Sequence, residues 1–109
     1  MSTLISLDDL LAKLGRRSVT LVEALPAAHY ARGHLPTAVN LPLDTLERAA
    51  AAVLTDKGAE VVVYCSGPTC GNSHVAQRKL EALGYGNVLV FAGGKAEWTE
   101  RGNALEVAS

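Results

Sequence analysis

The sequence lacks an excess of charge of either sign. Ten lysines and arginines face eleven aspartates and glutamates, which leaves a formal net charge of −1 at pH 7. A domain that binds nucleic acid or an anionic membrane surface by electrostatics usually carries a clear basic surplus. We therefore expect neither nucleic acid nor a membrane as a partner.

Long apolar runs and cysteines are also scarce. No apolar run approaches the roughly 20 residues that cross a bilayer, and the N-terminal region turns acidic at Asp8 and Asp9, where a signal peptide would be apolar. We therefore expect a cytoplasmic protein, whose thiols are normally reduced. Two cysteines, Cys65 and Cys70, do not make a disulfide framework. Their presence has to be explained by packing or by chemistry.

What the sequence does contain is apolar residues in the periodicities of helices and strands. The apolar share is 49% of 109 residues, enough for one hydrophobic core, and we expect a single domain over 1–109. The patterns predict helices over 7–14, 27–31, 43–54 and 72–83, a last short helix around Trp98, and strands over 18–23, 39–41, 61–64 and 88–91. This alternation indicates an α/β domain, with a mainly parallel sheet covered by helices on both faces.

Cys65 is the first residue after an apolar run that is typical of a strand buried on both faces. In parallel sheets, ligands bind where the carboxyl ends of strands lead into helix N-termini. The residues that follow Cys65 can turn their N–H groups inward as an anion-binding loop, and the next helix adds the positive end of its dipole. Both effects favour a thiolate or a persulfide anion at Cys65. The candidate anion-binding residues are Ser66, Gly67, Pro68, Thr69, Cys70, Gly71, Asn72 and Ser73.

The alternative for Cys65 is a small buried residue without a chemical role, as free cysteines often are. Cys70 lies five residues further along the same loop. If the loop curls, the two sulfurs can approach disulfide distance, and Cys70 would resolve a persulfide or a sulfenic acid on Cys65. Equally, Cys70 can simply fill space in the loop. A metal cluster of Cys65, Cys70 and His74 is a remote third option, because the cysteine spacing is not that of common zinc sites.

Several segments together resemble the single-domain rhodanese-like (thiosulfate sulfurtransferase-like) family over nearly the whole chain. They are residues 30–42, with Gly33-His34-Leu35-Pro36 at their centre, then Val63-Tyr64-Cys65, Leu83-Gly84-Tyr85, Asn87-Val88, and Gly93-Gly94 followed by Trp98. The resemblance implies a parallel sheet of about five strands between helices. It also implies that Cys65 accepts sulfane sulfur from thiosulfate or a persulfide and passes it to cyanide or a thiol. It implies no cofactor and no metal.

The loop departs from the pattern of this family. It is longer than usual and contains no arginine or lysine, so an anionic donor would depend on main-chain amides. Arg78 in the following helix and Lys95 after the glycine pair are candidate sources of positive charge. His34 and His74 are further candidate supporting residues, although we expect His34 to order a turn by hydrogen bonding.

Three classes of function remain open at this point. The first is an enzyme that forms a persulfide on Cys65. The second is a sulfur carrier that takes a persulfide from a partner protein, and the third is a redox sensor whose output is a Cys65–Cys70 disulfide. Phosphatases of related fold need an arginine at the far end of the loop to stabilise the transferring phosphoryl group. Gly71 or Asn72 stands there instead, which argues against phosphatase activity.

Overall fold

Helices and strands alternate along the chain, as the periodicities predict. The computed structural model describes residues 3–107, so residues 1–2 and 108–109 of the expected domain lie outside the described residues. The elements are α1 (Leu7–Gly15), β1 (Thr20–Glu23), α2 (Ala27–Arg32), β2 (Val39–Asn40), α3 (Leu46–Val53), β3 (Val61–Tyr64), α4 (Asn72–Ala82), β4 (Val88–Phe91) and α5 (Gly94–Glu100). None of the helices within residues 3–107 has the length and apolar character needed to cross a membrane.

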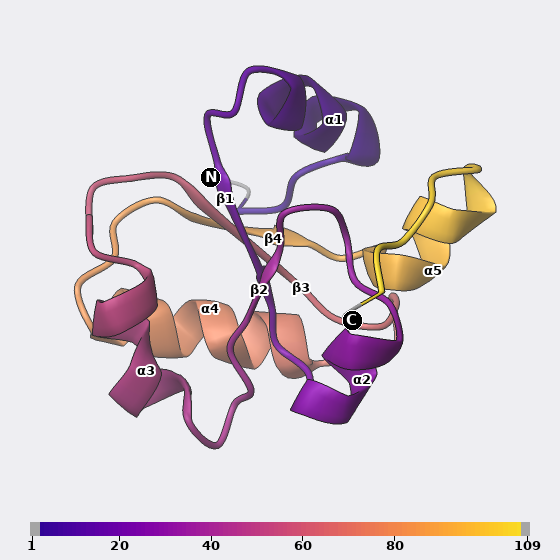
Figure 1. Cartoon of the computed structure of the whole chain (residues 1–109). Coiled ribbons are helices and arrows are strands. Elements are labelled where there is room, and N and C mark those ends of the chain that lie inside the picture. The colour runs from indigo at the N-terminus through magenta and orange to yellow at the C-terminus, as the bar shows by residue number, and fades with distance from the viewer. Residues whose placement is uncertain (1–2, 108–109) are drawn as a thin grey trace.

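The strands form one parallel sheet in the order β2-β1-β3-β4 (Figure 1). The register places Glu23 of β1 beside Tyr64 of β3, and Tyr64 beside Phe91 of β4. These three residues are the last of their strands, so the carboxyl ends meet at one edge of the sheet. The residue after Tyr64 is Cys65, which therefore stands at this edge.

Within the described residues the sheet has four strands rather than about five. The N-terminal segment extends it by a single parallel bridge, between Leu4 and Val90. In this bridge Ile5 N donates to Val90 O at 2.9 Å, and Val90 N donates to Thr3 O at 2.8 Å. The pairing stops there because the next residue, Ser6, caps α1 by accepting the Asp9 N–H on its hydroxyl at 3.1 Å.

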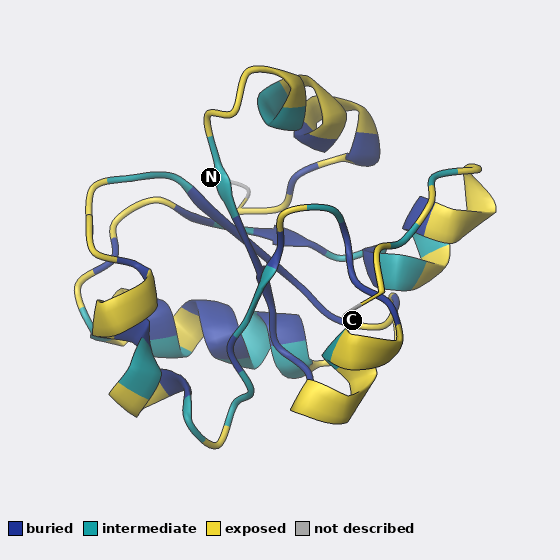
Figure 2. Ribbon diagram, viewed as in Figure 1, coloured by how far each residue is buried: buried dark blue, intermediate teal, exposed yellow. Residues whose placement is uncertain are grey.

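Each face of the sheet has its own hydrophobic core, and Figure 2 shows the buried strands between helices whose outer sides are exposed. On one face α3 and α4 contribute Leu46, Ala50, Ala76 and Leu80. On the other face α1 and α5 contribute Leu7, Leu10 and Trp98. All four residues of β3 are buried, which is why this strand reads as a continuous apolar run. The strand that leads to Cys65 is thus held from both sides.

Candidate active site

Cys65 lies at the base of the loop between β3 and α4, with its side chain turned into the protein. The residue is only 1% exposed. Its Sγ is 3.2 Å from the carbonyl oxygen of Cys70 and 3.5 Å from Oγ of Ser73, which is itself buried in the first turn of α4. The loop and the helix therefore close over the sulfur from the side away from the sheet.

The loop curls so that the two cysteines meet. The Cys70 N–H donates to the Gly67 carbonyl at 3.1 Å, which closes a tight turn. Cys65 Sγ donates to the Cys70 carbonyl oxygen at 3.2 Å, the two side chains lie close enough for each to shift the pKa of the other, and both are free thiols. Hydrogen bonding by the main-chain N–H groups of Asn72 and Ser66 and by the Ser66 hydroxyl lowers the pKa of Cys70. We call these three donors the amide cradle of Cys70.

The surroundings of the two thiols shift their pKa values in opposite directions. Burial is the main reason that the pKa of Cys65 is raised, and the hydrogen bond with Cys70 raises it further, against smaller opposing effects of the Ser73 hydroxyl and N–H. Burial acts on Cys70 in the same direction, but the hydrogen bonds from Cys65, Asn72 and Ser66 outweigh it and lower the pKa of Cys70. The sequence led us to expect the more stable thiolate at Cys65. Main-chain N–H groups favour the thiolate at both cysteines, from Ser73 at Cys65 and from Asn72 and Ser66 at Cys70, but the pKa is lowered only at Cys70.

The other loop residues divide into anchors and exposed positions. Ser66, Pro68, Thr69 and Gly71 are exposed. Gly67 is buried against α5, where an added Cβ would lie 3.2 Å from Cβ of Ala96. Asn72 donates from its side chain to the Ala24 carbonyl at 3.1 Å and so fixes the start of α4 beside the end of β1. The anion-binding character of the loop therefore comes from its main chain rather than from charged side chains.

The start of α5 is locked onto the main chain around Cys65. The N–H groups of Lys95 and Ala96 donate to the carbonyls of Cys65 and Ser66 at 3.1 and 2.9 Å. Gly94, just before them, has φ +58°, and a Cβ at this position would lie 2.3 Å from the Cys65 carbonyl oxygen. Only glycine combines this left-handed conformation with so close an approach. The glycine pair of the sequence is thus explained by contact with the cysteine.

Lys95 does not face the loop with its ammonium group. Nζ lies 3.0 Å from Oε2 of Glu23 and 3.0 Å from the His29 carbonyl oxygen. Glu23 is fully buried, and its Oε1 accepts the Tyr64 hydroxyl at 2.7 Å. That hydroxyl in turn accepts the Leu35 N–H at 3.0 Å. Neither Glu23 nor Tyr64 was among the site residues predicted from the sequence, although Tyr64 lies in one of the segments that resemble the family. The signal for Glu23 was a carboxylate at the end of an otherwise apolar strand.

The remaining candidate supporting residues lie away from the cysteine pair. His34 is buried and stacks on the Tyr30 ring with centroids 3.9 Å apart, and its Nδ1 is 2.9 Å from the Tyr30 carbonyl oxygen. It therefore orders a turn, as expected. Arg78 is exposed on α4, and His74 is half-buried on the same helix. His74 does not form a cluster with the two cysteines, and residues 3–107 contain no group of three potential metal ligands.

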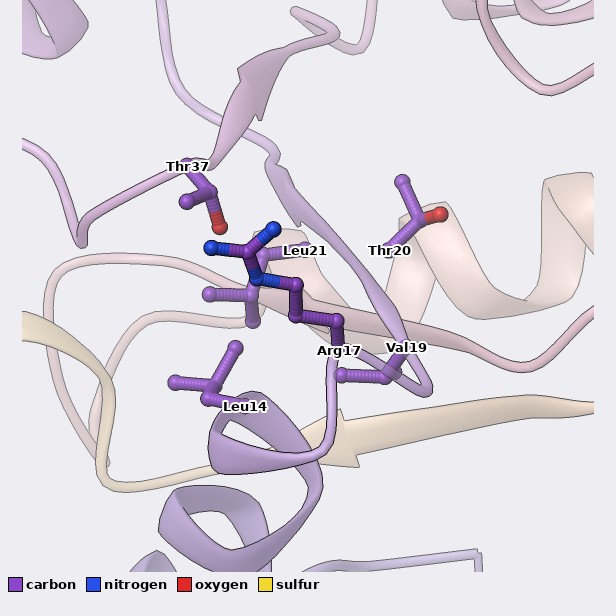
Figure 3. A pocket seen from close by; sticks show the side chains of 6 residues that line it. All are labelled: Leu14, Arg17, Val19, Thr20, Leu21 and Thr37. Atoms are coloured by element: carbon purple, nitrogen blue, oxygen red, sulfur yellow. The ribbon is translucent and has the colours of Figure 1, made fainter.

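A hollow of about 390 Å³ lies at the opposite, amino-terminal edge of the sheet (Figure 3). Its lining residues are Leu14, Arg17, Val19, Thr20, Leu21 and Thr37. Arg17 reaches across it toward Thr37, and both have positive φ angles, 54° and 69°. The hollow contains no thiol, and Thr20 begins the strand whose other end carries Glu23. It is therefore separate from the Cys65 site.

The fold and the site together define a class of protein: a three-layer α/β domain with a buried thiol at the mouth of a strand–loop–helix unit. Comparison with known families agrees with this description. Residues 6–101 match the family described as Rhodanese-like domain. The chain belongs to the rhodanese-like family.

Two curated relatives and one solved structure are similar to the chain. A sulfurtransferase of Allochromatium vinosum is 32% identical over 84 residues, which are 77% of this chain and 75% of that protein. An HTH-type transcriptional regulator of Mycobacterium tuberculosis, Rv0324, is 36% identical over 62 residues, which are 57% of this chain and only 26% of the regulator. The crystal structure of thiosulfate sulfurtransferase from Pseudomonas aeruginosa is 28% identical with a TM-score of 0.86, and the match covers 99% of this chain and 20% of that one. The chain thus matches parts of longer proteins as well as most of one relative.

Proposed function

We propose that the protein is a sulfurtransferase that accepts sulfane sulfur as a persulfide on Cys65 and passes it to a thiophilic acceptor. The observation that carries the proposal is the placement of Cys65 Sγ at the buried base of the loop, 3.2 Å from the carbonyl oxygen of a second cysteine, Cys70. Family membership and the sulfurtransferase relative support a role in sulfur transfer. Catalysis would be covalent, because a thiolate splits one sulfur transfer into two easier steps.

In the first step Cys65 takes up the sulfur atom. Cys65 loses its proton, and the Cys65 thiolate attacks the sulfane sulfur of the donor. A new S–S bond forms on Cys65 while the donor's S–S bond breaks. Thiosulfate would leave as sulfite, and a donor persulfide would leave as a thiol. In the second step the acceptor attacks the outer sulfur and restores the Cys65 thiolate, giving thiocyanate from cyanide or a new persulfide from a thiol.

The donor class follows from the charge of the site. The loop from Ser66 to Asn72 carries no cationic side chain, and the nearby Lys95 ammonium is paired with Glu23. Thiosulfate carries two negative charges, whereas a persulfide carries at most one at the reacting end. Both donors supply sulfane sulfur, and the site favours the less charged one. This is also the observation that favours a second candidate function, that of a sulfur carrier loaded by a partner protein's persulfide.

Intact-mass spectrometry after incubation with each donor tests the proposal. The reduced protein, Cys65→Ser and Cys70→Ser would be treated separately with thiosulfate and with a low-molecular-weight persulfide. The proposal expects Cys70→Ser to gain one sulfur atom and Cys65→Ser to gain none. Faster loading by the persulfide than by thiosulfate would support the donor assignment.

Two results would contradict the proposal. If Cys70→Ser gains no sulfur from either donor, Cys65 does not accept sulfane sulfur. If wild type forms a Cys65–Cys70 disulfide equally well with hydrogen peroxide and with the donors, a redox-sensing role explains the thiol pair better. Failure of thiosulfate alone, with loading by the persulfide, would select the carrier function.

A further inference from the structure

The Cys70 sulfur occupies the place that a loop of this kind offers to an anion. The loop is curled by the Cys70 N–H, which donates to the Gly67 carbonyl at 3.1 Å, and hydrogen bonding by the Asn72 and Ser66 N–H groups and the Ser66 hydroxyl lowers the pKa of Cys70. Inward-pointing N–H groups at a helix start bind anions because their partial positive charges add up. In this chain they stabilise a thiolate that belongs to the protein itself. The loop thus favours the thiolate, which is the nucleophilic form of Cys70.

The same sulfur is in direct contact with Cys65. Cys65 Sγ donates to the Cys70 carbonyl oxygen at 3.2 Å, and the two side chains lie close enough for each to shift the pKa of the other. Cys65 is almost completely buried, whereas Cys70 is half-buried. The atom of Cys65 that faces Cys70 is therefore Sγ, the inner sulfur once a persulfide has formed.

We propose that Cys70 is a second catalytic thiol, whose thiolate attacks Sγ of persulfidated Cys65 and expels the carried sulfur as hydrosulfide. This inference rests on the proposed function, because it begins from the loaded Cys65. The Cys70 Sγ–Cys65 Sγ bond forms as the bond between Cys65 Sγ and the outer sulfur breaks. The outer sulfur takes the electron pair and a proton and leaves as HS⁻. The two cysteines are oxidised to a disulfide, and the sulfane sulfur is reduced to sulfide.

The cycle then needs a thiol as reductant. Two equivalents of a monothiol, or one dithiol, reduce the Cys65–Cys70 disulfide by exchange through a mixed disulfide and become oxidised in turn. Cys70 is the more accessible sulfur for the incoming thiol, because Cys65 is buried. The protein would therefore convert sulfane sulfur and a thiol into sulfide and a disulfide, in addition to passing sulfur to an acceptor.

A single-turnover experiment without added thiol tests this step. Anaerobic wild type, Cys70→Ser and Cys70→Ala would be mixed with the persulfide donor, and sulfide and intact mass would be followed together. Wild type is expected to release one sulfide per protein and to lose two hydrogens. Both Cys70 variants are expected to keep one added sulfur atom and to release sulfide only after dithiothreitol is added.

The outcomes separate this inference from the proposed function. Wild type that holds the sulfur stably on Cys65 overturns the inference and leaves the proposed function intact, whereas sulfur carried on Cys70 by peptide mapping contradicts both. Loss of loading in both Cys70→Ser and Cys70→Ala contradicts the proposed function itself. A disulfide without stoichiometric sulfide also overturns the inference, because direct oxidation then explains it.

A second variant tests the cradle rather than the thiol. Ser66→Ala removes the hydroxyl that donates to the Cys70 sulfur. Sulfide release should then slow at neutral pH and recover at higher pH, where the Cys70 thiolate forms without that donor. A purely structural role of Ser66 would lower the rate equally at every pH, and that result would count against the inference.

Discussion

Lys95 connects the buried carboxylate of Glu23 to the main chain of Cys65. Its Nζ lies 3.0 Å from Glu23 Oε2, while its N–H donates to the Cys65 carbonyl at 3.1 Å. Oε2 of Glu23 accepts no hydrogen bond from any residue that the structure describes. Its contact with Lys95 Nζ is therefore an ion pair. Nζ donates its hydrogen bond to the His29 carbonyl oxygen instead. The ion pair of Glu23 and Lys95 thereby holds the start of α5 against the loop between β3 and α4.

Glu23→Gln removes one charge of this pair and keeps the shape of the side chain. The unpaired Lys95 ammonium then stays largely buried, with 16% of its side chain exposed. We expect a loss of about 3 kcal/mol in the free energy of unfolding, at the low end for a broken buried pair, because Lys95 still reaches some water. Urea unfolding of Glu23→Gln, Lys95→Met and the double variant gives the coupling energy. Additive losses in the double variant would show that the pair is not coupled.

Tyr64→Phe removes a hydroxyl that serves two buried partners. The hydroxyl donates to Glu23 Oε1 at 2.7 Å and accepts the Leu35 N–H at 3.0 Å. Leaving both groups unpaired should cost about 2 kcal/mol of unfolding free energy. Tyr30→Phe is the matched control, because the Tyr30 hydroxyl donates to Ala38 O at 2.6 Å in a half-buried place that water can reach. Equal losses in the two variants, measured by urea unfolding, would contradict the special role of Tyr64.

Gly94→Ala should displace α5 from the loop. The new Cβ would lie 2.3 Å from the Cys65 carbonyl oxygen and 2.9 Å from the Gly67 nitrogen. Gly102→Ala is the control, since Gly102 also has a positive φ, 87°, but no atom lies within 4 Å of its added Cβ. The control should lose about 1–2 kcal/mol for the left-handed conformation alone. Gly94→Ala should lose more and should also slow persulfide loading of Cys65, as intact-mass kinetics would show.

The two thiols should react with an alkylating agent at different pH. The thiolate is the reacting form, and the lowered pKa of Cys70 gives it a larger thiolate fraction than Cys65, whose pKa is raised. Iodoacetamide at neutral pH should therefore label Cys70 first, and peptide mass spectrometry can show which cysteine carries the label. As the pH rises, labelling of Cys65 should increase later than that of Cys70.

Cys65→Ala provides the control for this order of labelling. It removes the side chain whose hydrogen bond contributes most to lowering the pKa of Cys70. The pH midpoint of Cys70 alkylation should then move upward. An unchanged midpoint would mean that the Cys65 thiol does not stabilise the Cys70 thiolate.

Local sequence signals predicted most of the elements in the fold. The buried strand β3 has the predicted bounds because a strand covered on both faces is apolar throughout. The cap at Ser6 and the end of α1 at Gly15 were likewise visible as residue types. Within residues 3–107 the sheet of about five strands has four strands and a single bridge at Leu4, because the length of that pairing depends on how far the chain runs before Ser6 caps the helix. Hydrophobic pattern alone does not fix that length.

The site was predictable in its location and less so in its electrostatics. The spacing of Cys65 and Cys70 predicted that the sulfurs can approach each other, and the curled loop places Cys65 Sγ 3.2 Å from the Cys70 carbonyl oxygen. Which sulfur receives the amide donors depends on the loop's backbone conformation, which residue types leave undetermined. The partner of Lys95 was not predicted, because Glu23 lies far away in sequence and only the packing of β1 beside β3 brings it close.

The donors around the Cys70 sulfur are mostly main-chain groups, and this has a consequence for redesign. Pro68 and Thr69 point to solvent, while the frame of the loop is held from outside by Asn72 and Gly94. Replacing Cys70 with glycine would therefore free the N–H groups that now stabilise the Cys70 sulfur, so that they could bind an external oxyanion. This single substitution would change the ligand that the loop prefers, without any other change in the fold.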